Sequence, residues 1–148
     1  MPPLRYRANT FDLVYALSVF THLPEEASAQ WLKELSRILV PGGLLIATTH
    51  GVQAVETIKS SKDIQESMFG LKAGEIEKLA AELEPSGFLF RQYDQFVINV
   101  AKAGADYGNA FIHSNYIHSR WNSERLKVLA HLPGGLRAWQ DITVLIKE

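Results

Sequence analysis

Residues 11–51, FDLVYALSVFTHLPEEASAQWLKELSRILVPGGLLIATTHG, carry the clearest indication of the fold. The first part of this stretch, Phe11 to Leu17, is a nearly continuous apolar run, which is typical of a strand buried on both faces of a parallel sheet. Leu44 to Thr49 is a second run of the same kind. A helical pattern separates the two runs. The order strand, helix, strand predicts a βαβ unit with parallel strands.

The helix between the two strands has clear start and stop signals. Pro24 suits the first helical position, and Pro41-Gly42-Gly43 is expected to stop the helix and turn the chain. Apolar residues recur at three- and four-residue spacing between these signals and predict one buried stripe. They are Ala27, Trp31, Leu32, Leu35, Ile38 and Leu39.

The remainder of the chain reads as one domain, 1–148, without an internal repeat or linker. Residues 1–10 form an extended lead-in, and residues 52–122 are interpreted as helical and lid-like insertions. Within the insertions, residues 52–84 are predicted to be helical, with the helical region ending at Pro85-Ser86-Gly87. Residues 88–100 are predicted to hold one or two strands, and residues 101–107 to form a connecting segment. Ser114 is a possible cap of a short helix.

Two alternating segments close the chain and predict an antiparallel strand pair. One runs from Leu126 to Leu132 and the other from Ile142 to Ile146. Pro133-Gly134-Gly135 lies between them and is expected to form the loop.

The phrase over residues 11–51 resembles the class I S-adenosylmethionine-dependent methyltransferases. Phe11 to Leu23 looks like the family's fourth strand with its following turn, and Leu35 to Ile46 looks like its run from the fourth helix into the fifth strand. Ser123 to Glu148 fits the antiparallel pair with which that fold ends, and Asp106 to Ser114 resembles a subgroup of these proteins. The resemblance implies an α/β fold: a partial Rossmann-like methyltransferase sheet with parallel strands plus a C-terminal antiparallel strand pair.

One part of the family pattern has no counterpart here. The ten glycines include no Gly-x-Gly, the loop that in this family cradles the methionine part of the cofactor. Since Phe11 matches the fourth strand, the resemblance implies the C-terminal half of the fold, with about three strand–helix units expected upstream of Met1. S-adenosylmethionine is therefore the implied cofactor, and this chain alone is expected to bind it weakly or not at all.

The site residues follow from the carboxyl ends of the predicted strands, where open α/β sheets bind ligands. The resemblance places the backbone around Leu17 and Ser18, together with Phe20, beside the cofactor. His22 and His50 each follow a buried strand and are candidate catalytic bases, because the pKa of histidine lies near neutrality. The alternative is that either histidine only hydrogen-bonds to the backbone.

A second group of residues is predicted to line the acceptor pocket from the lid-like segment: His113, Tyr116, Arg120 and Trp121. The alternative for Tyr116 and Trp121 is simple core packing, since aromatic residues at helical spacing commonly serve that purpose. No metal is expected, because His113 and His118 are five residues apart and no His-Glu-x-x-His occurs.

Composition limits the classes of partner. Fifteen basic and sixteen acidic residues give a net charge of −1 with no basic block, which argues against a nucleic-acid partner and favours a small-molecule methyl acceptor. There is no cysteine, no apolar run long enough to cross a bilayer and no secretory signal, so a cytoplasmic protein without membrane contact is expected.

Three functional hypotheses remain open. The first is methyl transfer from S-adenosylmethionine to a small-molecule acceptor, carried out by a full-length protein. Whether this chain alone is an active enzyme stays open. The second is a non-catalytic interaction or scaffold protein that retains half of the fold. A nicotinamide-binding oxidoreductase is less favoured, because its glycine fingerprint is absent too. In the family's strand order one side of Phe11–Leu17 is left open. This predicts self-association through the open edge or by exchange of elements, or else a need for a partner fragment.

Overall fold

A computed structural model describes residues 2–69, 71–72, 74–93, 98–100, 104, 107–123 and 125–148. Its strands are β1 Phe11–Ala16, β2 Leu39–Thr49, β3 Phe88–Gln92, β4 Gly108–Ile112, β5 Leu126–Leu136 and β6 Gln140–Lys147. Its helices are α1 Glu25–Ile38, α2 Val52–Lys59, α3 Lys62–Phe69, α4 Glu75–Ser86 and α6 Ser114–Tyr116, with a 3-10 turn η1 Phe20–His22 and a π turn η2 Ile117–Trp121.

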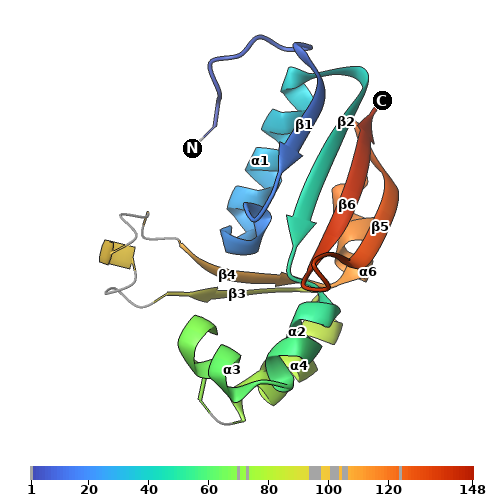
Figure 1. Cartoon of the computed structure of the whole chain (residues 1–148). Coiled ribbons are helices and arrows are strands. Elements are labelled where there is room, and N and C mark those ends of the chain that lie inside the picture. The colour runs from blue at the N-terminus through green and yellow to red at the C-terminus, as the bar shows by residue number, and fades with distance from the viewer. Residues whose placement is uncertain are drawn as a thin grey trace.

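The main sheet has four strands in the order β1-β2-β6-β5 (Figure 1). β1 and β2 are parallel, with Val14 opposite Leu45, and α1 connects them. β6 runs antiparallel to both β2 and β5, so it is the one strand of this sheet that opposes the others. The predicted βαβ unit, the C-terminal antiparallel pair and the α/β fold class are therefore confirmed.

One face of the sheet carries the main core. Leu32 and Leu35 of α1, together with Trp121 of η2, pack there against Leu45 and Leu145 of the two central strands. The spacing of the apolar residues in α1 explains this packing, because a three- and four-residue period puts them on one side of a helix.

β1 is only half covered, and the expectation that it is buried on both faces is wrong. Leu13 is 51% exposed and Tyr15 is 70% exposed, whereas Ala16 on the other face is buried. Two causes combine. β1 lies at the edge of the sheet, with β2 as its partner on one side, and α1 covers only one of its faces.

The second layer lies across the carboxyl ends of β1 and β2. Figure 1 shows the β3–β4 hairpin running crosswise there, with α2, α3 and α4 on its far side. The hairpin is joined to β2 by a hydrogen bond from the Ile112 amide to the His50 carbonyl, 2.8 Å long. The helical prediction for 52–84 is confirmed as three separate helices.

β3 confirms one predicted strand in 88–100, and residues 98–100 are helical. Residues 94–97, and most of the predicted connection at 101–107, lie outside the described residues, as does Asp106 of the segment that resembles a methyltransferase subgroup. β4 was not predicted.

The first Pro-Gly-Gly acts differently from expectation. α1 already ends at Ile38, and Leu39 pairs with Phe11 as a strand residue instead of continuing the helix. The next paired residues are Leu13 and Leu44, so residues 40–43 bulge out of the ladder. A Cβ on Gly43 would lie 2.9 Å from the Val40 carbonyl oxygen, which explains a glycine at this close approach.

The second Pro-Gly-Gly is not the loop of the C-terminal hairpin. β5 continues through it to Leu136, and the turn is made by Arg137 and Ala138, whose φ angles are 57° and 55°. Non-glycine residues adopt this left-handed conformation at a cost, so local sequence preference does not reveal such a turn.

The start of α6 differs from the prediction, whereas the predicted helix stop at Pro85-Ser86-Gly87 is confirmed. His113, not Ser114, caps α6, because its Nδ1 accepts a hydrogen bond of 3.1 Å from the Asn115 amide. α4 runs through Pro85 to Ser86 and ends at Gly87, whose φ of 73° is the left-handed conformation common after a helix.

Candidate functional site

Four residues that follow the two parallel strands form the centre of the site. Leu17 and Ser18 come directly after β1, and His50 and Gly51 come directly after β2. Ligands of open α/β sheets bind at such carboxyl ends. The β3–β4 hairpin crosses the same edge (Figure 1), and the Phe111 ring of β4 contacts the His50 ring.

Ser18 has a strained backbone that its neighbours hold in place. Its φ is 54°, in the left-handed region. Its amide donates to Thr48 Oγ1 at 2.8 Å, and its hydroxyl lies 3.0 Å from Gln140 Nε2, which donates to it. Strain of this kind is concentrated at functional sites, where the surrounding structure enforces it.

Ser18→Gly is expected to be more stable than Ser18→Ala by about 1 kcal/mol, because both lose the hydroxyl but only glycine relieves the left-handed strain. Urea denaturation of the two variants measures the difference. An alanine variant as stable as the glycine variant would show that the backbone of Ser18 is not strained.

A pocket of about 540 Å³ adjoins Ser18. Its walls are mostly apolar and come from the end of β1, from α3 and from the β5–β6 turn. They are Leu17, Ser18, Ile64, Leu136, Arg137, Trp139 and Gln140. The volume lies in the range typical of small-molecule sites, and the walls offer an aromatic ring, an amide and a hydroxyl to a ligand.

His22 is held by the hairpin. Its Nδ1 donates to the Gly108 carbonyl oxygen at 2.9 Å, and the rings of Tyr107 and Tyr93 lie 4.9 and 6.3 Å from the His22 ring centre. When the ring is neutral, this bond places the proton on Nδ1 and leaves the Nε2 lone pair free. Nε2 of His22 is therefore available to accept a proton.

His50 lies deeper in the same cluster. Its side chain contacts Phe69, Phe111 and Trp139, and the residue is 4% exposed. Burial, and next the nearby His22, lower the pKa of His50 to about 4, so it is neutral at pH 7. Its Nδ1 has no hydrogen-bond partner among the described residues. The two histidine rings lie 6.5 Å apart, so the fold brings both candidate bases together.

A buried carboxylate supports this edge of the sheet. Asp141 Oδ1 accepts a hydrogen bond of 2.8 Å from the Gly134 amide, and Asp141 Oδ2 lies 3.3 Å from Nε2 of His131. A Cβ on Gly51 would overlap this carboxylate and would lie 2.6 Å from its Cγ. Asp141 thus occupies the space that a side chain at Gly51 would need, beside the N-terminus of α2.

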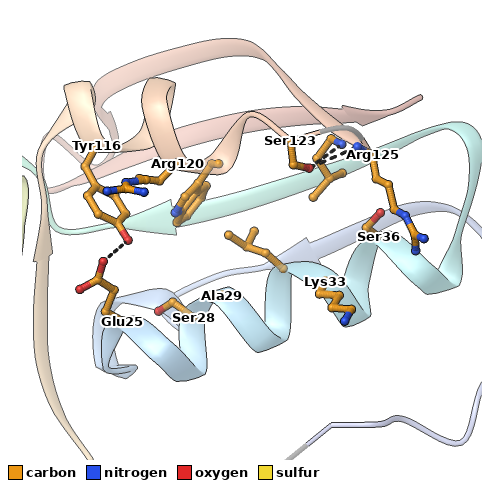
Figure 2. A pocket seen from close by; sticks show the side chains of 12 residues that line it. Glu25, Ser28, Ala29, Lys33, Ser36, Tyr116, Arg120, Ser123 and Arg125 are labelled. Carbon is orange, nitrogen blue, oxygen red and sulfur yellow. Dashed lines mark hydrogen bonds between the residues drawn. The ribbon is translucent and has the colours of Figure 1, made fainter.

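The remaining predicted site residues lie elsewhere. Phe20 is fully buried and packs on Trp121 with ring centres 5.1 Å apart, so its side chain lines none of the pockets described here. Tyr116, Arg120 and Trp121 share a groove beside α1 (Figure 2). His113 is separate from them and faces a cleft formed with α2 and α4.

Sequence reasoning missed several residues of the site. Tyr93 and Tyr107 flank His22, and Tyr107 falls in the segment that resembles a methyltransferase subgroup, which was the one available signal. Trp139 and Gln140 join the pocket because the β5–β6 turn folds back over Ser18. Nothing local in the sequence marks these two residues.

In the described ranges, no group of three or more His, Asp or Glu side chains could hold a metal ion. No helix in the same part of the chain is long and apolar enough to cross a membrane.

Comparison with known proteins connects this geometry to a family. The sequence model of the methyltransferase domain matches residues 2–47, which include β1, α1 and most of β2. The chain is related to the class I S-adenosylmethionine-dependent methyltransferases. The methyltransferase resemblance of residues 11–51 is thereby confirmed, and the methyl donor of this family is S-adenosylmethionine. No curated protein matches the chain by sequence.

Solved structures show the same methyltransferase-type fold. A protein of Pyrococcus horikoshii OT3 is 14% identical, with a TM-score of 0.57, and the match covers 99% of this chain and 56% of that one. An S-adenosylmethionine-dependent methyltransferase of Methanosarcina mazei is also 14% identical, with a TM-score of 0.50, and the match covers 98% of this chain and 63% of that one. The chain thus spans roughly three-fifths of the length of these structures.

Proposed function

We propose that the whole protein transfers a methyl group from S-adenosylmethionine to a small-molecule acceptor. The observation that supports this best is the position of His22: it follows β1, in the region matched by the methyltransferase domain, and the Gly108 carbonyl oxygen orients its ring through Nδ1. When bound, S-adenosylmethionine supplies an electrophilic methyl group on a sulfonium. The protein then has to align the acceptor and remove its proton.

His22 suits the proton transfer better than His50. A general base works best when its pKa lies near the working pH, and burial holds the pKa of His50 at about 4. His50 is therefore a weak base at pH 7. Its neutral ring packs near His22, with the ring centres 6.5 Å apart, and adds no positive charge to the cluster.

The pocket at Ser18 suits part of the cofactor. Leu17 and Trp139 offer apolar surface, while the Ser18 hydroxyl and the Gln140 amide offer polar contacts. The sequence contains no Gly-x-Gly loop, and this supports the expectation that this chain alone binds S-adenosylmethionine weakly.

Calorimetric titration with S-adenosylmethionine tests the proposal on this chain and on a longer protein that contains it. We expect a micromolar dissociation constant for the longer protein only. Micromolar binding by this chain alone would contradict the expectation of weak binding. Absence of binding by the longer protein would overturn the proposed function.

A second proposal, an interaction role, is supported by the exposed edge of β1. Leu13 and Tyr15 of β1, and Leu17 directly after it, present large apolar side chains to solvent, and β1 has β2 as its partner on one side. Unpaired apolar edges of this kind are ready to pair with another strand. We therefore also propose that two copies associate through β1.

Tyr15→Lys is expected to weaken self-association by at least 10-fold, because a desolvated lysine on the edge opposes strand pairing. Sedimentation velocity over a range of concentrations measures it. Leu129→Lys is the matched control, since Leu129 is a large exposed apolar residue on β5, at the opposite edge. A wild-type chain that stays monomeric at high concentration would refute association through β1.

A further inference from the structure

A groove of about 410 Å³ lies between α1 and the segment from α6 to the start of β5 (Figure 2). It shares no lining residue with the pocket at Ser18. Phe20 and Trp121, packed against each other, fill the core beside it. The groove is therefore a second site and not an extension of the first.

At one end of the groove the charges balance. Tyr116 donates its hydroxyl to Glu25 Oε1 at 2.5 Å, and Figure 2 shows Arg120 beside Tyr116. Burial, and next the bond to Glu25, raise the pKa of Tyr116, so its hydroxyl keeps its proton and remains the donor. The carboxylate of Glu25 and the guanidinium of Arg120 have opposite charges, so this end of the groove has no net charge.

At the other end, the described residues have an excess of positive charge. Arg125 extends from the start of β5 across the groove toward Ser36 on α1, and Lys33 lies one turn earlier on the same helix (Figure 2). Among the described residues neither cation forms an ion pair. Lys147 pairs with Leu126 across the β5–β6 ladder, and its ammonium donates to Asn9 Oδ1 and to the Leu39 carbonyl oxygen. The nearby carboxylate of Glu148 pairs with Lys127, with Oε2 of Glu148 3.8 Å from Nζ of Lys127.

Ser36 adds an unused hydrogen-bonding group at this positive end. The residue is 2% exposed, and its hydroxyl oxygen has no partner within the described part of the chain. Buried polar atoms are normally paired, so an unpaired hydroxyl on the wall of a groove points to a ligand.

The floor between the two ends is apolar. It is made by Leu32 of α1, Trp121 of η2 and Leu126 of β5. A flat hydrocarbon body can pack on these side chains, and the volume of the groove is large enough for one.

We propose that this groove binds an organic anion, with its carboxylate or phosphate between Arg125 and Ser36 and its flat apolar body over Leu32, Trp121 and Leu126. Arg125 donates charge-assisted hydrogen bonds to the anion, Ser36 donates its hydroxyl, and Lys33 adds positive charge.

Calorimetric titration of the 148-residue chain with four probes tests the site. 2-Naphthoate and 2-naphthyl phosphate carry the two anionic groups on one body, 2-naphthamide is the neutral analogue, and inorganic phosphate is the anion alone. We expect submillimolar binding of at least one naphthyl anion, with the tighter one naming the preferred anion, and binding at least 10-fold weaker for the amide and for inorganic phosphate. Equal affinity for acid and amide would overturn the proposal.

Variants locate the anion within the groove. Arg125→Gln is expected to weaken binding of the preferred naphthyl anion at least 10-fold, and Arg120→Gln, the same change at the balanced end, less than about 3-fold. Ser36→Ala removes a hydroxyl that bonds nothing in the described protein, so it leaves folding intact and provides a second test, with an expected loss of about 3- to 10-fold. Unchanged affinity in both Arg125→Gln and Ser36→Ala would refute the site.

Discussion

Gly51→Ala is expected to lower the free energy of unfolding by about 3 kcal/mol or more. A Cβ at this position overlaps the carboxylate of Asp141, which is buried and bonded to the Gly134 amide. To make room, Asp141 must move away from that donor and from His131, which leaves a buried charge with fewer partners. Gly51 itself has a φ of −102°, a value open to alanine, so the cost comes from the overlap and not from the backbone.

Urea denaturation measures this effect, and two further variants isolate its cause. Gly104→Ala is the matched control, because a Cβ there meets nothing within 4 Å, and we expect a change below about 1 kcal/mol. In an Asp141→Ala background the overlapping carboxylate is absent, so Gly51→Ala should cost less than about 1 kcal/mol. A cost that is the same in both backgrounds would show that Asp141 is not the obstacle.

The second large effect is a loss of stability in acid that is caused by His50. Its pKa is about 4 in the folded protein and near 6.5 when the chain is unfolded. The unfolded chain therefore binds a proton more readily, and stability that is fully present above pH 6.5 is lost as the pH falls to 4. The shift corresponds to about 3 kcal/mol.

His50→Phe tests this assignment, because phenylalanine keeps the ring among Phe69, Phe111 and Trp139 but cannot take up a proton. The free energy of unfolding, measured by urea at pH 7.5, 6, 5 and 4, should fall about 3 kcal/mol less in this variant than in the wild type. His118→Phe, at an exposed histidine, should keep the wild-type pH dependence. Parallel curves for His50→Phe and the wild type would contradict the role of His50.

Local sequence patterns were enough to predict the strand–helix–strand unit and the antiparallel ending. Periods of three to four residues in α1 and of two residues in β5 and β6 reflect which side of each element is buried, and such periods are local properties. The same local patterns placed His22 and His50 after the two parallel strands. The carboxyl ends of parallel strands meet at one edge of a sheet, and this alone brings the two histidines close together.

Long-range packing overrides the local signals at several positions. Both Pro-Gly-Gly segments resemble turns, yet pairing with Phe11 draws Leu39 into β2, and a left-handed Arg137-Ala138 turn carries β5 past Gly135. The bond of His22 to Gly108, the overlap of Asp141 with the space beside Gly51, and the meeting of Arg125 with Ser36 join residues from distant elements. No short-range pattern encodes such contacts, because each depends on how separately formed elements pack together.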